Sequence, residues 1–89
     1  MALVRYFAAA ADAAGCAEER VASATVGDFI AHAIATHGSG FERVVRQCSF
    51  LLDGDRVDVY DETGVLAEGA STPLTRADTL DVLPPFAGG

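Results

Sequence analysis

Residues 25–38 read Thr-Val-Gly-Asp-Phe-Ile-Ala-His-Ala-Ile-Ala-Thr-His-Gly, and this stretch predicts the main helix of the chain. Thr25 is suited to cap the free amides at the helix start, and Asp28 adds a carboxylate in the favourable first turn. Gly38 is placed to end the helix. We therefore expect a helix over residues 26–37 with one apolar face, because its apolar residues recur at helical spacing: Val26, Phe29, Ile30, Ala33 and Ile34.

Short strands are predicted on both sides of this helix. Residues 2–7 and 79–83 combine β-branched, aromatic and alternating apolar residues, and they form the first and last strands. Residues 19–24 suit a hairpin return, and 49–52 a strand followed by a possible return over 56–60. The order of these elements gives an α+β fold in which one main helix crosses one face of a mixed sheet. The crossover is expected to be right-handed.

The connecting segments carry weaker signals. Residues 8–14 are rich in alanine and predict a short helical turn closed by Gly15, with a plain loop as the alternative. Apolar residues within 41–48 repeat at helical spacing, which fits a second short helix or an irregular segment. We interpret residues 61–71 as an exposed excursion and residues 73–78 as a tight turn before the last strand.

Alternation along the first and last strands predicts which side chains face the helix. In a strand, successive side chains point to opposite faces of the sheet. Phe7 and Leu83 are then apolar residues on the face that no helix covers, and we expect them to dock partners. The residues expected to face the helix are Val4, Tyr6, Leu80 and Val82.

After the last strand the sequence continues as Pro84-Pro85-Phe86-Ala87-Gly88-Gly89. Two prolines cannot extend a sheet ladder and hold the backbone extended, while the glycines carry no Cβ that would block a narrow channel. At about 3.3 Å per residue, such a tail extends about 20 Å, which is enough to enter another protein's active site. We expect a domain over residues 1–83 and an extended tail over 84–89, with the carboxylate of Gly89 as its reactive group.

Composition narrows the range of partners. The chain has 89 residues, a net charge of −7 and arginine as its only strongly basic residue type, so nucleic acid is an unexpected partner. No apolar run is long enough for a membrane span, and no leader pattern opens the sequence, so we expect a cytoplasmic protein. Because the chain lacks lysine, a covalent link from Gly89 must join it to another molecule or to an amino terminus.

Other reactive side chains give no recognisable site. Cys16 and Cys48 lack the spacing of a redox or disulfide motif, and we interpret them as an incidental thiol and a small core residue. His32 and His37 lie five residues apart on the predicted helix, so we expect them not to share a face or bind a metal. The acidic residues within 53–62 lack the spacing of a calcium loop. Without a nucleophile and base in a known arrangement, the chain is not expected to be an enzyme alone.

Several motifs together resemble one known family. They are Val-Arg-Tyr-Phe-Ala at 4–8, Thr-Val-Gly-Asp at 25–28, Pro-Leu-x-x-Ala-Asp-Thr-Leu at 73–80, and the terminal Pro-Pro-Phe-Ala-Gly-Gly. In this combination the chain resembles the ubiquitin-like sulfur carriers over nearly its whole length. The double proline is most similar to the small subunit of molybdopterin synthase, the MoaD type.

The resemblance implies a β-grasp fold with the first and last strands side by side at the sheet centre. It also implies that an E1-like adenylating enzyme uses ATP to activate Gly89. Sulfur from a persulfide, supplied by a rhodanese or a cysteine desulfurase, then leaves a thiocarboxylate. The tail residues Pro84, Pro85, Phe86, Ala87 and Gly88 would insert into the large subunit of molybdopterin synthase, where sulfur forms the dithiolene of molybdopterin. The carrier itself would bind no cofactor.

Other uses of the same tail remain open. One is sulfur delivery to another product, such as cysteine, thiamine or a thiolated natural product. Another is a ubiquitin-like modifier, with Gly89 joined to a target lysine, and the last is a small domain whose glycines have no role. Two departures from the family also stand out: residues 8–11 are all alanine, so contacts made there by relatives are not carried over, and the 58–71 segment is longer.

Overall fold

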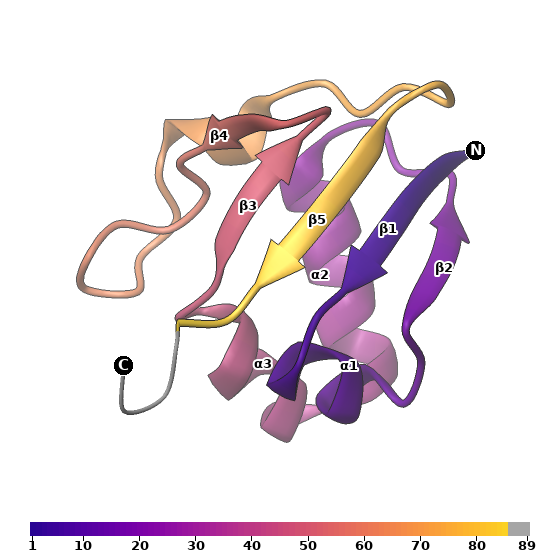
Figure 1. The fold of residues 1–89 in the computed structure, drawn as a ribbon. Coiled ribbons are helices and arrows are strands. Elements are labelled where there is room, and N and C mark those ends of the chain that lie inside the picture. Colours follow the sequence, from indigo (N-terminus) through magenta and orange to yellow (C-terminus); the bar gives the residue numbers. More distant parts are fainter. Residues whose placement is uncertain (86–89) are drawn as a thin grey trace.

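The computed structural model describes residues 1–85, so the expectations for Phe86–Gly89 lie outside the described residues. Five strands form one mixed sheet in the order β2-β1-β5-β3-β4, shown in Figure 1. β1 and β5 run parallel at the centre, and the other neighbours pair antiparallel. The strands are β1 (Ala2–Tyr6), β2 (Glu18–Val21), β3 (Ser49–Leu52), β4 (Asp55–Val57) and β5 (Thr79–Leu83).

The main helix, α2 (Val26–His37), lies across one face of this sheet (Figure 1). Its start is capped as predicted, because the side-chain oxygen of Thr25 accepts a hydrogen bond from the Asp28 amide at 3.1 Å. At its end the Gly38 amide donates to the Ile34 carbonyl at 2.8 Å. The α+β class and the ubiquitin-like β-grasp architecture with one main helix are therefore confirmed.

Both predicted short helices are present, as α1 (Ala9–Ala14) and α3 (Ser39–Val45). Gly15 ends α1 in a left-handed conformation with φ of 77°, where a side chain would be strained. In Figure 1 the two helices lie together near the end of the sheet at which β1 and β5 finish. They close the apolar layer at this end without covering the outer face of the sheet.

The hydrophobic core fills the space between the sheet and α2. Val4 and Tyr6 of β1 are buried, and so are Leu80 and Val82 of β5, which confirms the predicted alternation. The largest other side chains of this core are Phe29, Ile30 and Phe41 from the helices and Phe50 from β3. Along each central strand, one set of alternate residues therefore packs in the core, and the other set lies on the opposite face of the sheet.

Three strands were predicted too long, the first of them by one residue, because β1 ends at Tyr6. The strand expected over 19–24 ends at Val21, because the Ala24 carbonyl accepts a hydrogen bond from the Leu74 amide at 2.9 Å and the chain turns there. The return expected over 56–60 ends at Val57, where β4 stops. The following residue, Asp58, packs its carbonyl against Gly69 and leaves the ladder.

The interpretation of residues 61–71 as an exposed excursion is wrong for their C-terminal end. Val59 is only 1% exposed, and its carbonyl accepts a hydrogen bond from the Ala67 amide at 2.7 Å. The short helix η1 (Glu68–Ser71) then packs against α2, where Ala70 lies close to Gly27. The expected exposure holds for residues 61–66, of which all but Gly64 are exposed, while the buried Val59 before them and η1 after them anchor the loop to the fold.

Candidate functional site

The face of the sheet opposite α2 carries the residues that sequence reasoning assigned to partner docking. We call it the open face. Across the central strands, Arg5 pairs with Asp81 and Asp81 pairs with Leu51. Two residues further along β5, Leu83 pairs with Ser49. The open face consists of Leu3, Arg5, Phe7, Leu51, Thr79, Asp81 and Leu83.

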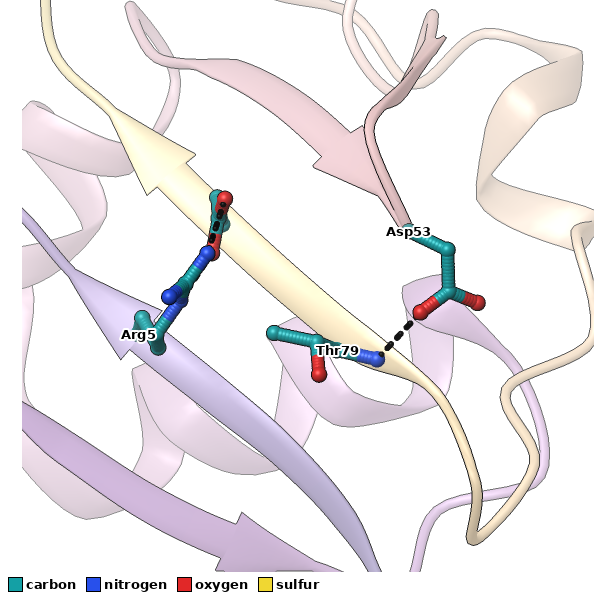
Figure 2. Close-up of polar contacts among 4 residues, drawn as sticks. Arg5, Asp53 and Thr79 are labelled. Carbon is teal, nitrogen blue, oxygen red and sulfur yellow. Dashed lines mark hydrogen bonds and ion pairs between the residues drawn. The ribbon is translucent and has the colours of Figure 1, made fainter.

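An ion pair occupies the centre of the open face. The Arg5 guanidinium donates two hydrogen bonds to Asp81, from Nε to Oδ1 at 2.6 Å and from Nη2 to Oδ2 at 2.8 Å. Figure 2 shows the Arg5 side chain reaching from β1 across to β5. The Asp81 carboxylate raises the pKa of Arg5, chiefly through these hydrogen bonds. This bidentate geometry holds both side chains in fixed positions between the two parallel strands.

A second contact fixes the start of β5. The Thr79 amide donates to Asp53 Oδ1 at 2.9 Å (Figure 2), and the Asp53 amide donates to the Thr79 carbonyl at 2.8 Å. Asp53 lies in the turn between β3 and β4 and has a φ of 51°, a conformation that aspartate tolerates better than most residues. Through this contact the turn holds the strand from which the tail continues.

Phe7 and Leu83 lie at the tail end of the open face, as predicted. The Phe7 side chain is 39% exposed, and its amide donates to the Val82 carbonyl at 3.1 Å, which continues the β1–β5 pairing by one residue. The Arg5 guanidinium lies 5.9 Å from the centre of the Phe7 ring. Leu83 is half-buried and is followed by Pro84, also half-buried, and Pro85, which is exposed. The predicted docking residues are therefore neighbours at the point where the tail begins.

The polar part of this site was not predicted from the sequence. Arg5, Asp81 and Asp53 were not singled out, although a signal for the first two was available. Arg5 and Asp81 have opposite charges and the same outward parity on two strands that the family resemblance placed side by side. The Asp53 contact depends on how the β3–β4 turn folds onto β5, which no local pattern encodes.

The cysteines differ from reactive thiols in their surroundings. Burial raises the pKa of Cys48 to about 11, and its thiol donates to the Val44 carbonyl at 3.3 Å. Burial also raises the pKa of Cys16. Because the thiolate is the nucleophilic form, both side chains are poor sulfur acceptors at neutral pH.

Within residues 1–85, the two histidines do not belong to a cluster of potential metal ligands. His32 and His37 border the same hollow beside β2, so the expectation that they face apart is wrong in this respect. Among residues 1–85, no set of three or more His, Cys, Asp or Glu side chains is arranged to hold a metal ion. Over the same residues, no helix combines the length and apolar character that crossing a bilayer requires.

Comparison with known proteins places this geometry in context. No family model and no curated protein match the sequence. Solved structures do match over the whole chain. Small archaeal modifier protein 1 (SAMP1) from Haloferax volcanii has a TM-score of 0.72 and 25% identity, covering 99% of this chain and 98% of that one. SAMP1 from Methanosarcina acetivorans has a TM-score of 0.76 and 22% identity, covering 99% and 95%.

A third match was solved together with a partner. Subunit 1 of the molybdopterin-converting factor from Helicobacter pylori, in a complex with subunit 2, matches with a TM-score of 0.63 and 20% identity, covering 99% of this chain and 97% of that one. The chain is therefore a small ubiquitin-like protein of β-grasp fold, similar over its full length to SAMP1 and to molybdopterin-converting factor subunit 1.

Proposed function

We propose that this chain is a sulfur carrier whose Gly89 carboxylate is adenylated and converted to a thiocarboxylate. The observation that carries the proposal is the Pro-Pro-Phe-Ala-Gly-Gly sequence directly after β5, a central strand held on both sides. The Arg5–Asp81 and Asp53–Thr79 contacts fix that strand, so the point from which residues 84–89 continue has a defined position beside Phe7 and Leu83.

The chemistry requires activation first. A carboxylate resists nucleophilic attack, so the Gly89 oxygen attacks the α-phosphorus of ATP and pyrophosphate leaves. The terminal sulfur of a persulfide on a rhodanese or cysteine desulfurase then attacks the acyl carbon of the adenylate, and AMP leaves. A thiol of the activating system attacks the other sulfur of the resulting acyl disulfide, which forms a disulfide and releases the Gly89 thiocarboxylate. The chain supplies the acyl group, whereas the E1-like enzyme binds ATP and the chain itself binds no cofactor.

We further propose that the acceptor is a molybdopterin precursor bound by a large subunit. Two deliveries from Gly89 thiocarboxylates supply the two dithiolene sulfurs, with Pro84 to Gly88 inserted in the large subunit's active site and Phe7 and Leu83 docked outside it. The Helicobacter pylori complex of subunits 1 and 2 supports a partner of this kind. In this scheme the carrier is the non-catalytic subunit, because the partner provides the catalytic pocket. The reaction takes place in the cytoplasm.

A second function is favoured by the similarity to SAMP1. In this alternative, a target lysine amine rather than a persulfide attacks the Gly89 adenylate, and the product is an isopeptide. The two functions share the same activated intermediate and differ in the nucleophile that follows. The absence of lysine from this chain means that its own side chains cannot extend such a modification into a polymer.

Reconstitution separates the two functions. The thiocarboxylated chain is mixed with a purified molybdopterin synthase large subunit and cyclic pyranopterin monophosphate, and molybdopterin is measured in a single turnover. The proposal predicts product with the full chain and none with the carboxylate form at Gly89, which is the matched control. Absence of product, together with lysine adducts when the adenylate is offered to cell proteins, would establish the modifier function instead.

A further inference from the structure

Phe7 is the aromatic residue of the open face, and its backbone is held from two sides. Its amide donates to the Val82 carbonyl at 3.1 Å, and its own carbonyl accepts a hydrogen bond from the Ala10 amide at 3.0 Å. The pairing register, continued by one residue, places Phe7 opposite Leu83. Phe7 is nevertheless 39% exposed, so the main chain fixes where the side chain starts but not which rotamer it adopts. The orientation of the ring therefore depends on neighbouring side chains.

Arg5 is the side chain placed to orient this ring. It precedes Phe7 by two residues in the same extended segment, so both side chains project from the open face. The guanidinium carbon lies 5.9 Å from the centre of the Phe7 ring, within the range of a cation–π contact. The Arg5 side chain is itself 47% exposed, and a long exposed side chain samples many rotamers unless it is restrained. Arg5 can orient the ring only if another group holds the guanidinium.

Asp81 supplies this restraint from the neighbouring strand. Nε and Nη2 of Arg5 donate to its two carboxylate oxygens, at 2.6 Å and 2.8 Å. The Asp81 side chain is only 14% exposed, so it has less freedom than the arginine that it binds. A bidentate contact fixes the plane of a guanidinium as well as its position. Asp81 thereby sets where the cation lies relative to the Phe7 ring.

A second carboxylate flanks Arg5 without fixing it. Glu18 lies opposite Arg5 on β2, the strand on the other side of β1, and it is exposed. Within residues 1–85, no hydrogen bond or ion pair joins the Glu18 side chain to Arg5. The pKa of Arg5 is raised chiefly by the hydrogen bonds to Asp81, and the charge of Glu18 adds to this effect. One of the two flanking acids therefore sets the geometry of the guanidinium, whereas the other contributes only charge.

We propose that Asp81 and Arg5 are positioning residues of the docking site, and that they hold the Phe7 ring in the orientation that the large subunit binds. Asp81 acts through Arg5, and Arg5 acts through its cation–π contact with the ring. The inference rests on the proposed function, because it takes the large subunit as the partner of Phe7. A ring that is already held loses less conformational entropy on binding. The ion pair then serves binding, although a solvent-screened pair adds little to stability.

The first test measures the χ1 rotamer of Phe7 in the free, full-length chain, from the three-bond couplings of its backbone nitrogen and carbonyl carbon to Cγ. We expect a single rotamer in the unaltered chain and averaged couplings in Asp81→Asn, because an amide cannot accept both Arg5 hydrogen bonds. Glu18→Gln is the matched control, since it removes the same charge beside Arg5 and should leave the couplings unchanged. If Asp81→Asn does not fold, Arg5→Gln removes the same contact. A single rotamer without the contact, or equal averaging in Asp81→Asn and Glu18→Gln, would overturn the proposal.

The second test measures affinity for the purified molybdopterin synthase large subunit by calorimetric titration. Asp81→Asn should weaken binding about two- to tenfold, the loss expected when one more side chain must be immobilised on binding. In a Phe7→Leu background no ring remains to be oriented, so the same substitution should have no further effect.

Two binding results would contradict the proposal. One is an unchanged affinity for Asp81→Asn, and the other is a loss that persists in the Phe7→Leu background, because Arg5 or Asp81 would then contact the partner directly. If the unaltered chain does not bind the large subunit, the proposed function fails instead. The couplings of Phe7 then still show whether Asp81 orients the ring.

Discussion

The two faces of the sheet use the same strands for different purposes. On the covered face, Val4 and Leu80 are 0% exposed and pack under α2. On the open face, one residue further along, Arg5 and Asp81 form an ion pair beside the partly exposed Phe7. The comparison shows that alternation along β1 and β5 decides whether a residue packs in the core or lies on the open face, where we propose that partners dock. Substitutions on the two faces should therefore have effects of different kinds.

The largest loss of stability is expected on the covered face. Leu80→Ala leaves a cavity at a fully buried site, so we expect the free energy of unfolding to fall by about 2–5 kcal/mol. Leu83→Ala, on the same strand but half-buried on the open face, is the matched control and should cost about 1 kcal/mol or less. Urea denaturation of both variants provides the measurement. Equal losses would mean that the two faces do not divide their roles in this way.

A second substitution tests whether the folded core includes the ends of the 58–71 segment. A Cβ at Gly69 would lie 2.1 Å from the Asp58 carbonyl oxygen, so Gly69→Ala must displace backbone and should cost about 1–3 kcal/mol. Gly40→Ala, whose Cβ would meet no atom within 4 Å, is the control and should be neutral or slightly stabilising. Thermal melting of both variants tests whether the ends of the 58–71 segment are part of the folded core. A tolerated alanine at position 69 would show that they are not.

We expect substitutions on the open face to change partner binding more than the free energy of unfolding. Leu83→Asp places a charge where an apolar contact with the large subunit is proposed, and affinity should fall at least about tenfold, or about 1.4 kcal/mol. The matched control is Leu66→Asp, because Leu66 is 58% exposed and lies outside the open face. Calorimetric titration with the large subunit compares the two. Equal affinities would remove Leu83 from the interface.

The central ion pair should contribute little to stability. The side chains of Arg5 and Asp81 are 47% and 14% exposed, so solvent screens their attraction. In urea denaturation, a double-mutant cycle with Arg5→Gln and Asp81→Asn should give a coupling energy that is small beside the loss caused by Leu80→Ala. A much larger coupling would mean that the open face also supports the fold.

The smallest expected effect is a change with pH at the turn before β5. The Thr75 amide donates to Asp78 Oδ2 at 2.7 Å, and this bond lowers the folded-state pKa of Asp78 below its ordinary value of 3.8. The stabilisation is complete above that ordinary value and is lost as the pH falls through the folded pKa. Asp78→Asn should therefore reduce the slope of stability against pH below about pH 4 in denaturation at several pH values. An unchanged slope would exclude this contribution.

Much of the fold could be predicted from the sequence, because its signals are local. The Thr25 cap, the apolar spacing of α2 and the alternation in β5 each act within a few residues, and the structure confirms them. The ends of β2 and β4 could not be predicted, since they depend on the contacts of Ala24 with Leu74 and of Asp58 with Gly69. These partners are far apart in sequence, and no local pattern records them.

The candidate site also contains some residues whose positions local patterns predict and others whose contacts they do not. The outward positions of Phe7 and Leu83 followed from strand parity alone. The ion pair of Arg5 with Asp81 and the clamp of Asp53 on Thr79 join residues distant in sequence, so they required the assembled sheet.

The central claim is that Gly89 carries sulfur, and intact mass spectrometry tests it most directly. The full chain and a variant lacking Gly88 and Gly89 are each incubated with ATP, an E1-like adenylating enzyme and a persulfide donor. If Gly89 carries sulfur, the full chain gains the mass that corresponds to one oxygen exchanged for sulfur. The shortened chain should fold equally well by urea denaturation and gain nothing. An unchanged mass for the full chain under conditions in which the enzyme forms its adenylate, or equal sulfur incorporation in both chains, would contradict the account.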